Sequence, residues 1–114
     1  MVKIDKYSFG KILINNKLYT KDLIILEDII KDNWQRKSGH SLILNDIQLI
    51  IDYQPDMIFI GTGKLGALKV SNDIISQINN YGINDVIVGK SDTIVEKFNK
   101  CKIAKKALAI HLTC

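Results

Sequence analysis

The sequence is short of cysteine and proline, and each shortage excludes a class of protein. Its 114 residues include two cysteines, Cys101 and Cys114, which are too few for a disulfide framework and lack the spacing of a metal cluster. The single proline, the seven glycines and the absence of any low-complexity run argue against a linker or a disordered tail. We therefore expect a single domain over residues 1–114, with both thiols free.

Long apolar segments are also missing. No stretch approaches about 18 apolar residues, the length that a membrane-spanning helix needs. The opening residues, Met-Val-Lys-Ile-Asp-Lys, carry charges where a signal peptide has an apolar core. The sequence therefore predicts no membrane partner and a cytoplasmic, reducing location.

Arginine is nearly absent, although the chain is basic. The formal net charge is +4, and Arg36 is the single arginine among 16 basic residues. Base edges and phosphates are recognised in bidentate fashion mainly by arginine. The lysines are spread thinly except at residues 97–106, where a solvated face is favoured over a patch for an acidic partner. We expect no specific nucleic-acid partner.

The remaining segments alternate between strand-like and helix-like patterns. Residues 4–14 and 18–26 flank Asn15-Asn16, a polar pair suited to a tight turn with positive φ. We therefore expect the chain to open with an antiparallel pair of strands. Residues 27–33 fit either a helical turn or an extended arm, and residues 34–40 form a polar loop that contains the single tryptophan.

Three segments carry apolar residues at helical spacing. The first spans about residues 45–54, with Asn45 as its N-cap and Gln48 as the capping-box partner. The second spans residues 71–81, and the third runs from a cap at Ser91 or Asp92 to about residue 100. The predicted buried stripes are Ile47, Ile50 and Ile51; Ile74, Ile75 and Ile78; and Ile94, Val95 and Phe98.

Two short apolar runs, Met57–Ile60 and Asp85–Val88, lie on either side of the second helical segment. A β-α-β connection places such strands parallel in one sheet. We expect them to be adjacent or nearly adjacent at the centre of a mixed sheet, with residues 104–112 as the last strand. The fold class is therefore α/β.

The glycine-rich loop at residues 61–66 fits the G-x-G-x-x-G pattern of dinucleotide-binding proteins. That pattern requires a helix at the glycines and an acidic residue at the tip of the next strand. Here residues 67–70 precede the helix, and the next strand ends in Val88-Gly89-Lys90. A P-loop has Lys-Ser or Lys-Thr after its last glycine, where this chain has Ala67-Leu68. We expect no nucleotide and no other cofactor.

Two interpretations of the loop remain. In the favoured one, glycine supplies the positive φ of a sharp exit from a buried strand. In the other, main-chain N–H groups at Gly61 and Gly63, the Thr62 hydroxyl and the Lys64 ammonium hold a small anion.

Other candidates are weaker. His40 and His111 are the only histidines and have no ligand spacing, so no metal site is expected. His111 and Cys114 resemble a base and a thiol nucleophile, but positions i and i+3 of a strand face opposite ways unless the chain bends. Trp34, Arg36 and His40 form either a partner surface or, with Trp34 as a lid, the edge of the core. The lid is favoured.

An ordered set of short segments resembles a known family. The set comprises Trp34, Gly39-His40, Pro55-Asp56, Ile60–Gly63, Ala67–Val70, Tyr81–Ile83, Phe98-Asn99 and His111–Cys114. It is similar to the small family of unknown function that includes the human adipogenesis-associated Mth938-domain protein and a mitochondrial complex I assembly factor. The resemblance covers essentially the whole chain.

The resemblance implies a compact three-layer α/β domain, with a mixed central sheet, helices and an N-terminal antiparallel β layer. It implies no established reaction and no catalytic residue, and the eukaryotic relatives are similar to adaptor or assembly proteins. The chain departs from the family pattern at residues 99–102, which lack a glycine turn, and at Gly66. The sequence therefore predicts a non-catalytic binding or assembly module. The alternative is an anion- or metabolite-binding protein, or an enzyme, with its site at residues 61–66.

Overall fold

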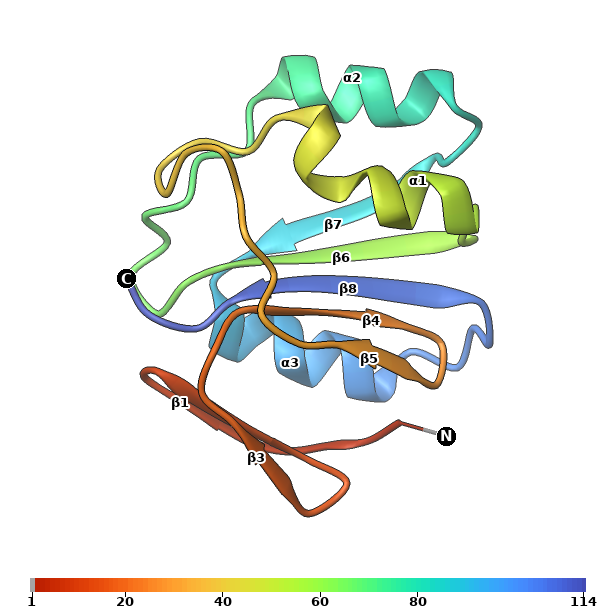
Figure 1. Ribbon diagram of the computed structural model, residues 1–114. Coiled ribbons are helices and arrows are strands. Elements are labelled where there is room, and N and C mark those ends of the chain that lie inside the picture. Colours follow the sequence, from red (N-terminus) through yellow and green to blue (C-terminus); the bar gives the residue numbers. More distant parts are fainter. Residues whose placement is uncertain (1) are drawn as a thin grey trace.

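The computed structural model describes residues 2–114 as a compact α/β domain with two sheets (Figure 1). The smaller sheet is antiparallel and contains β1 (Ile4–Ser8), β2 (Lys11–Ile14) and β3 (Lys17–Tyr19). The larger sheet is mixed and has the order β5-β4-β8-β6-β7. Its strands are β4 (Leu23–Leu26), β5 (Ile29–Lys31), β6 (Met57–Thr62), β7 (Asp85–Gly89) and β8 (Lys106–His111).

The helical elements cover both faces of the larger sheet. They are the 3-10 turn η1 (Leu44–Ile47) and the helices α1 (Gln48–Tyr53), α2 (Asn72–Asn80) and α3 (Ser91–Lys100). In Figure 1, α1 and α2 lie on one face, and α3 and the small sheet lie on the other. Within residues 2–114, none of these helices has the length and apolar character needed to traverse a bilayer.

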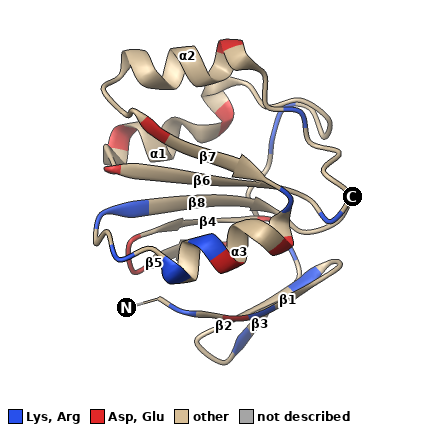
Figure 2. Cartoon of the chain, turned by 180° about the vertical axis from the view of Figure 1, so that it is seen from behind, with Lys and Arg blue, Asp and Glu red and all other residues tan. Residues whose placement is uncertain are grey.

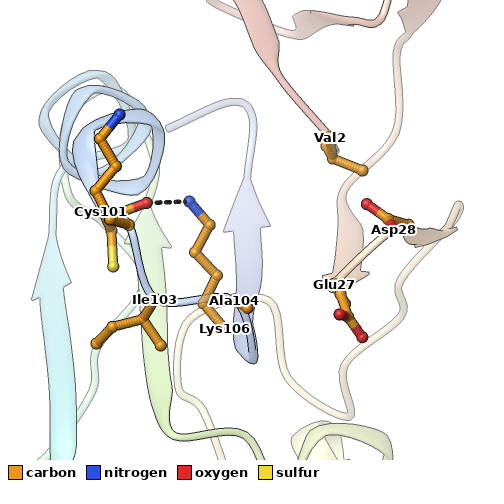
Figure 3. A pocket seen from close by; sticks show the side chains of 8 residues that line it. Val2, Glu27, Asp28, Cys101, Ile103, Ala104 and Lys106 are labelled. Atoms are coloured by element: carbon orange, nitrogen blue, oxygen red, sulfur yellow. Dashed lines mark hydrogen bonds between the residues drawn. The ribbon is translucent and has the colours of Figure 1, made fainter.

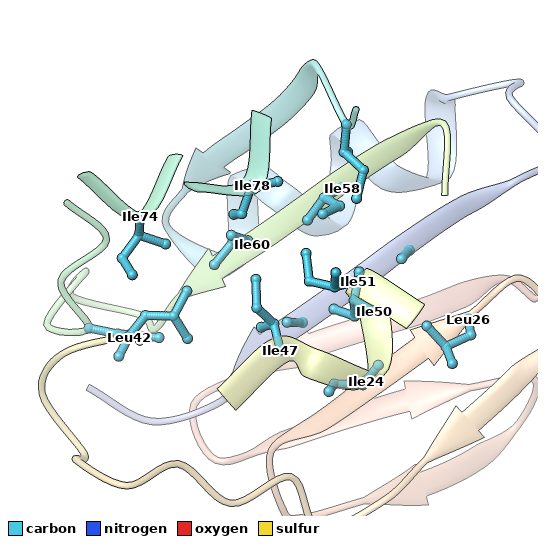
Figure 4. Packing of buried hydrophobic residues seen from close by; sticks show 14 residues of the cluster. Ile24, Leu26, Leu42, Ile47, Ile50, Ile51, Ile58, Ile60, Ile74 and Ile78 are labelled. Carbon is cyan, nitrogen blue, oxygen red and sulfur yellow. The ribbon is translucent and has the colours of Figure 1, made fainter. Parts of the chain in front are cut away.

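Each face of the larger sheet has its own apolar layer. Ile47, Ile50 and Ile51 pack with Ile74 and Ile78 under α1 and α2, as their spacing predicted (Figure 4). On the other face Ile94, Val95 and Phe98 are buried, again as predicted, and the Phe98 ring meets Phe59 edge-on with centroids 5.5 Å apart. Ile75 is only partly buried.

The predicted pairing of the two central strands is confirmed. β6 and β7 are parallel neighbours, with Met57 opposite Asp85 and Ile60 opposite Val88. On the other side of β6, β8 pairs with it in parallel. The opposite edge of β8 pairs with β4 in the antiparallel direction. Because β6, β7 and β8 run the same way, their carboxyl ends meet at one edge of the sheet.

The N-terminal prediction was correct at the turn and wrong in the strands. Asn15 and Asn16 have φ of 49° and 68°, as the predicted hairpin requires. Residues 4–14, however, form two strands rather than one, because the chain reverses at Gly10, whose φ is +78°. Residues 18–26 are also divided, since β3 joins the small sheet and β4 the large one. The ambiguous residues 27–33 are extended and contain β5.

Two predicted caps were wrong. Asn45 lies inside η1, and the carboxylate of Asp46 accepts the Ile43 N–H at 3.0 Å at this helix start. The third helix has Lys90 as its N-cap, because the Ser91 hydroxyl is turned toward the glycine loop. The Ser71 cap is confirmed, since its hydroxyl accepts the Ile74 N–H at 3.2 Å. The last strand begins at Lys106 rather than at residue 104.

Candidate functional site

The candidate site lies where β6, β7 and β8 end, and the residues after β8 fold back across this edge. Thr62 is the last residue of β6, and its hydroxyl donates to the Gly89 carbonyl at the end of β7, at 3.0 Å. His111 is the last residue of β8. The chain after it bends toward the glycine loop, so the predicted loop residues and the C-terminal segment (residues 112–114) form one structure.

The main-chain donors of the glycine loop hold oxygens of the C-terminal segment. The Lys64 N–H donates to the Thr113 carbonyl at 2.7 Å. The N–H groups of Leu65 and Ala67 both donate to the main-chain oxygen of Cys114, at 3.1 and 2.9 Å. The loop is therefore an oxygen-binding turn, and the oxygens in it come from the chain itself.

Close packing accounts for glycine at two loop positions. A Cβ atom at Gly61 would lie 2.8 Å from the Ser91 Oγ, and one at Gly63 would lie 2.4 Å from the Cys114 carbonyl carbon. Gly63 also has a φ of +103°, which side chains rarely allow. The Ser91 hydroxyl accepts the Gly63 N–H at 2.9 Å and donates to the His111 carbonyl at 2.6 Å, which joins the loop, α3 and β8.

A polar cluster beneath this edge centres on Asp22, a residue that the sequence analysis did not single out. Its carboxylate accepts from the Arg36 guanidinium at 2.9 Å, from His111 Nδ1 at 2.7 Å and from the Leu112 N–H at 2.7 Å. The side chains of Asp22, Arg36 and His111 are 17%, 6% and 13% exposed. We call these three residues the Asp22 cluster.

The His111 ring has polar neighbours at both nitrogens. Its Nδ1 lies 2.7 Å from an Asp22 carboxylate oxygen and 3.2 Å from Arg36 Nη2, and the shorter contact, to the carboxylate, favours a proton on Nδ1. The Thr113 hydroxyl lies 3.4 Å from Nε2. The bend after β8 thus places Thr113 next to the His111 imidazole. Within residues 2–114, the Cys114 thiol makes no hydrogen bond with the ring.

Of the three residues predicted as a partner surface or core edge, the structure brings Trp34 and Arg36 together, and His40 is exposed. The Trp34 indole N–H donates to the Asp46 carbonyl at 2.8 Å, and its ring packs against the layer under α1 and α2. The Arg36 guanidinium stacks 4.7 Å from the centre of that ring and faces inward, toward Asp22.

Exposed apolar side chains flank the same edge. Leu65, in the glycine loop, is 70% exposed, and Phe9, in the β1–β2 turn, is 54% exposed. Both turns are anchored on the C-terminal segment, since the Gly10 N–H donates to the Leu112 carbonyl at 2.9 Å. We call Phe9, Leu65 and the adjacent Lys64 the rim. The Lys64 ammonium lies 5.9 Å from the centre of the Tyr7 ring and 3.9 Å from an Asp92 oxygen.

A cavity of about 140 Å³ lies elsewhere, between the β4–β5 turn and the loop that follows α3 (Figure 3). Glu27 and Asp28 line one side, and Cys101, Ile103 and Lys106 line the other. The Lys106 ammonium donates to the Cys101 carbonyl at 2.9 Å and to the Phe98 carbonyl, and burial lowers its pKa. These bonds satisfy the end of α3, where the chain lacks the glycine turn of the family pattern.

Nearly the whole chain is similar to a known protein family. Residues 4–112 match the family model described as "Protein of unknown function (DUF498/DUF598)". The chain belongs to this family. None of the curated proteins matches the sequence.

Several solved structures share the DUF498 fold. MT938 has a TM-score of 0.78 at 18% identity, with all of both chains covered. The hypothetical protein PH1505 of Pyrococcus horikoshii OT3 has a TM-score of 0.80 at 19% identity, over 98% of this chain and 99% of that one. XCC1710 of Xanthomonas campestris has a TM-score of 0.78 at 14% identity, over 98% and 85%. These likenesses support the fold of the Mth938-like family that the sequence resembles, and they do not assign a function.

From the contacts of the Asp22 cluster we predict that a conservative substitution of Asp22 strongly lowers the stability of the protein. Asp22→Asn keeps the shape of the side chain but replaces a carboxylate that accepts from three donors. We expect the free energy of unfolding to fall by about 3–5 kcal/mol, because Arg36 is left buried without its counter-charge. Urea denaturation at neutral pH measures this. Asp32→Asn, on an exposed carboxylate, is the control, and an equally small effect at both positions would contradict the prediction.

A second prediction concerns Tyr7, whose hydroxyl donates to the Leu112 carbonyl at 2.8 Å. Burial raises the Tyr7 pKa above 10.0, and the charges of Asp92 and Asp22 add to the rise. Tyr7→Phe should destabilise the protein by about 1 kcal/mol near neutral pH, because one hydrogen bond is lost.

The pH dependence of this difference follows from the raised pKa. Above about pH 10 an unfolded tyrosine loses its proton while folded Tyr7 keeps it, so the wild type loses stability that the phenylalanine variant does not. The two free energies of unfolding should therefore converge as the pH rises from about 8 to about 11. Urea titrations of both proteins across this range test the point, and a constant difference would refute it.

Proposed function

We propose that the protein is a non-catalytic binding or assembly module and that a partner protein contacts the rim. The observation that carries the proposal is the exposure of Leu65 and Phe9 on two turns that are fixed to the same C-terminal segment. Aromatic side chains such as Phe9 are enriched in protein interfaces, and the buried centre of an interface is more apolar than the rest of the surface. Lys64 beside them favours a partner surface with acidic groups around an apolar centre.

The turns that present the rim are well anchored. The glycine loop is tied to Thr113 and Cys114 by three main-chain hydrogen bonds, and the β1–β2 turn is tied to Leu112. Surfaces that are already ordered lose little conformational entropy when a partner binds. The anchoring thus supports binding by the rim as it stands, without rearrangement.

The family resemblance supports the same proposal. The DUF498 family is one of unknown function, and the resemblance to Mth938-domain proteins implies a kinship with adaptor or assembly proteins. For this chain we propose membership of that functional type, a cytoplasmic location and no specific nucleic-acid partner. Its two cysteines are free thiols.

Affinity capture from an extract of the cells that contain this protein tests the proposal. The wild type should recover a reproducible protein partner. Phe9→Ser with Leu65→Ser should reduce recovery about tenfold or more, since burying each apolar side chain contributes about 1.5–3 kcal/mol. The melting temperature of the variant should stay near that of the wild type, because both side chains are largely exposed.

The matched control changes exposed apolar side chains away from the rim. Leu18→Ser with Tyr81→Ser affects side chains that are 56% and 49% exposed, and recovery should be unchanged. Equal recovery by the rim variant would show that the rim is not the contact surface. A protein that captures no partner but turns over a metabolite pool would refute the binding-module proposal itself.

The alternative is a small-anion or metabolite site at Gly61, Thr62, Gly63 and Lys64, with or without catalysis. One observation favours it: the loop's N–H groups converge on the main-chain oxygen of Cys114, while the Lys64 side chain is 45% exposed beside them. An anion would have to displace the C-terminal segment, so we rank this function second.

Thermal melting with added phosphate or acetate tests the alternative. If the loop binds anions, both should raise the melting temperature of the wild type, and Lys64→Ala should reduce the rise because it loses one charge-assisted contact worth about 1.5–3 kcal/mol at best. Lys21→Ala, on an exposed lysine at another site, is the control. Equal rises in wild type and Lys64→Ala would show that Lys64 is only a surface lysine.

A further inference from the structure

The two edges of the larger sheet differ in how they are protected. β5 has three residues and ends in Lys31, and short strands and lysines are common ways to block pairing at an edge. β7 has five residues, with neither lysine nor proline among them. In the part of the chain that the structure describes, residues 2–114, no strand pairs with its outer side. Alternate main-chain N–H and C=O groups of β7 therefore point outward, available for another strand.

The side chains of β7 are also incompletely covered. Val86, Ile87 and Val88 are each partly exposed, whereas nearly every residue of β6 and β8 is buried. Figure 2 shows β7 as the outermost strand of the sheet, next to β6. Helices α1 and α2 lie on one face of the sheet and α3 on the other (Figure 1), and within residues 2–114 no strand lies beside the outer edge of β7.

A shallow, widely open groove of about 370 Å³ lies beside the open edge. It is lined by three apolar side chains of the sheet, by two lysines of α3 and by the residue after α3: Met57, Phe59, Ile87, Lys97, Lys100 and Cys101. Phe59 and Ile87 are register partners in the β6–β7 pair, so they form a continuous apolar floor on one face. The groove therefore combines an apolar floor with two ammonium groups.

The charges around the groove favour one class of occupant. Lys97 and Lys100 are exposed, lie three residues apart on α3 and form no ion pair within residues 2–114. An acidic segment would satisfy both. A second copy of the chain, paired through its own β7, would instead bring two more lysines to the same face. Asp85 shares the face of Ile87 at the start of β7, so the occupant's acidic residues belong at the other side, over α3.

We propose that the β7 edge and its groove bind an extended acidic segment of a partner protein, which adds to the sheet as a sixth strand. The main chain of the segment pairs with β7, and an apolar side chain packs over Ile87 and Met57. Its carboxylates contact Lys97 and Lys100. The groove shares no residue with the rim, so this is a second contact surface, and it stands whether or not the rim binds a partner.

The probe for this proposal is a short peptide, Thr-Val-Thr-Glu-Thr-Glu-Thr, whose valine and two glutamates share one face of an extended strand. It is added to isotope-labelled protein and followed by NMR. Chemical-shift changes should gather at residues 85–89 and at Lys97 and Lys100. The outward-facing amide protons of β7 should also exchange more slowly, because they become hydrogen-bonded. The same peptide with lysine in place of glutamate should bind about tenfold more weakly or not at all.

Charge reversal separates this site from general attraction to a basic protein. Lys97→Glu with Lys100→Glu should weaken binding of the glutamate peptide about tenfold or more. Lys11→Glu with Lys17→Glu makes the same change of charge on the small sheet and should leave the affinity within about twofold. All four substituted side chains are exposed, so melting temperatures should be similar.

Several results would overturn the proposal. These are the absence of shifts at about 1 mM peptide, shifts centred away from β7 and α3, or equal binding by the Lys97→Glu, Lys100→Glu variant. Dimerisation of the protein that protects the β7 amides would assign the edge to a second copy instead. Equal shifts produced by decanoate would assign the groove to an acyl chain.

Discussion

The position of the C-terminal segment depends on one carboxylate. Asp22 lies just before β4, and it accepts hydrogen bonds from Arg36 in the long loop and from His111 and Leu112 at the end of β8. The cluster therefore joins three parts of the chain that are far apart in sequence. It is mostly shielded from water, so the attraction between Asp22 and Arg36 is screened less than in a surface ion pair. Together with the hydrogen bonds from Tyr7, Gly10 and Ser91 to the carbonyls of Leu112 and His111, the cluster fixes the direction in which the chain leaves β8.

The glycine loop takes its shape from that direction. Because the C-terminal segment crosses the end of β6, Gly63 has no room for a side chain, and the N–H groups of Leu65 and Ala67 find their acceptor in Cys114. The Ser91 hydroxyl completes the arrangement by bonding to both Gly63 and His111. The resemblance to a dinucleotide fingerprint is therefore a consequence of packing. Glycines that leave space for a pyrophosphate in other folds here leave space for the chain's own main chain.

Local patterns in the sequence were sufficient for much of the fold, and the candidate site shows where they stop. The isoleucine stripes of α1 and α2 and the parallel pairing of β6 with β7 follow from periodicity and from the handedness of β-α-β units. The division of residues 18–26 between two sheets does not, because it depends on which sheet offers each strand a partner. Asp22 was missed for a related reason. Its partners lie 14, 89 and 90 residues away, and no spacing rule connects an aspartate to residues so distant.

The same packing bears on the two functions proposed for this edge. An anion at the glycine loop must compete with the Cys114 oxygen, which is tethered beside the donors and therefore has an effective concentration on the order of mM or higher. A protein that docks on Leu65 and Phe9 displaces only water, and the release of water from apolar surface favours association. The contacts that weaken the loop as an anion site are the ones that fix the rim in place. A partner that binds the exposed side chains of Leu65 and Phe9 leaves the hydrogen bonds between the loop and Cys114 intact, whereas an anion bound to the loop's main chain would replace them.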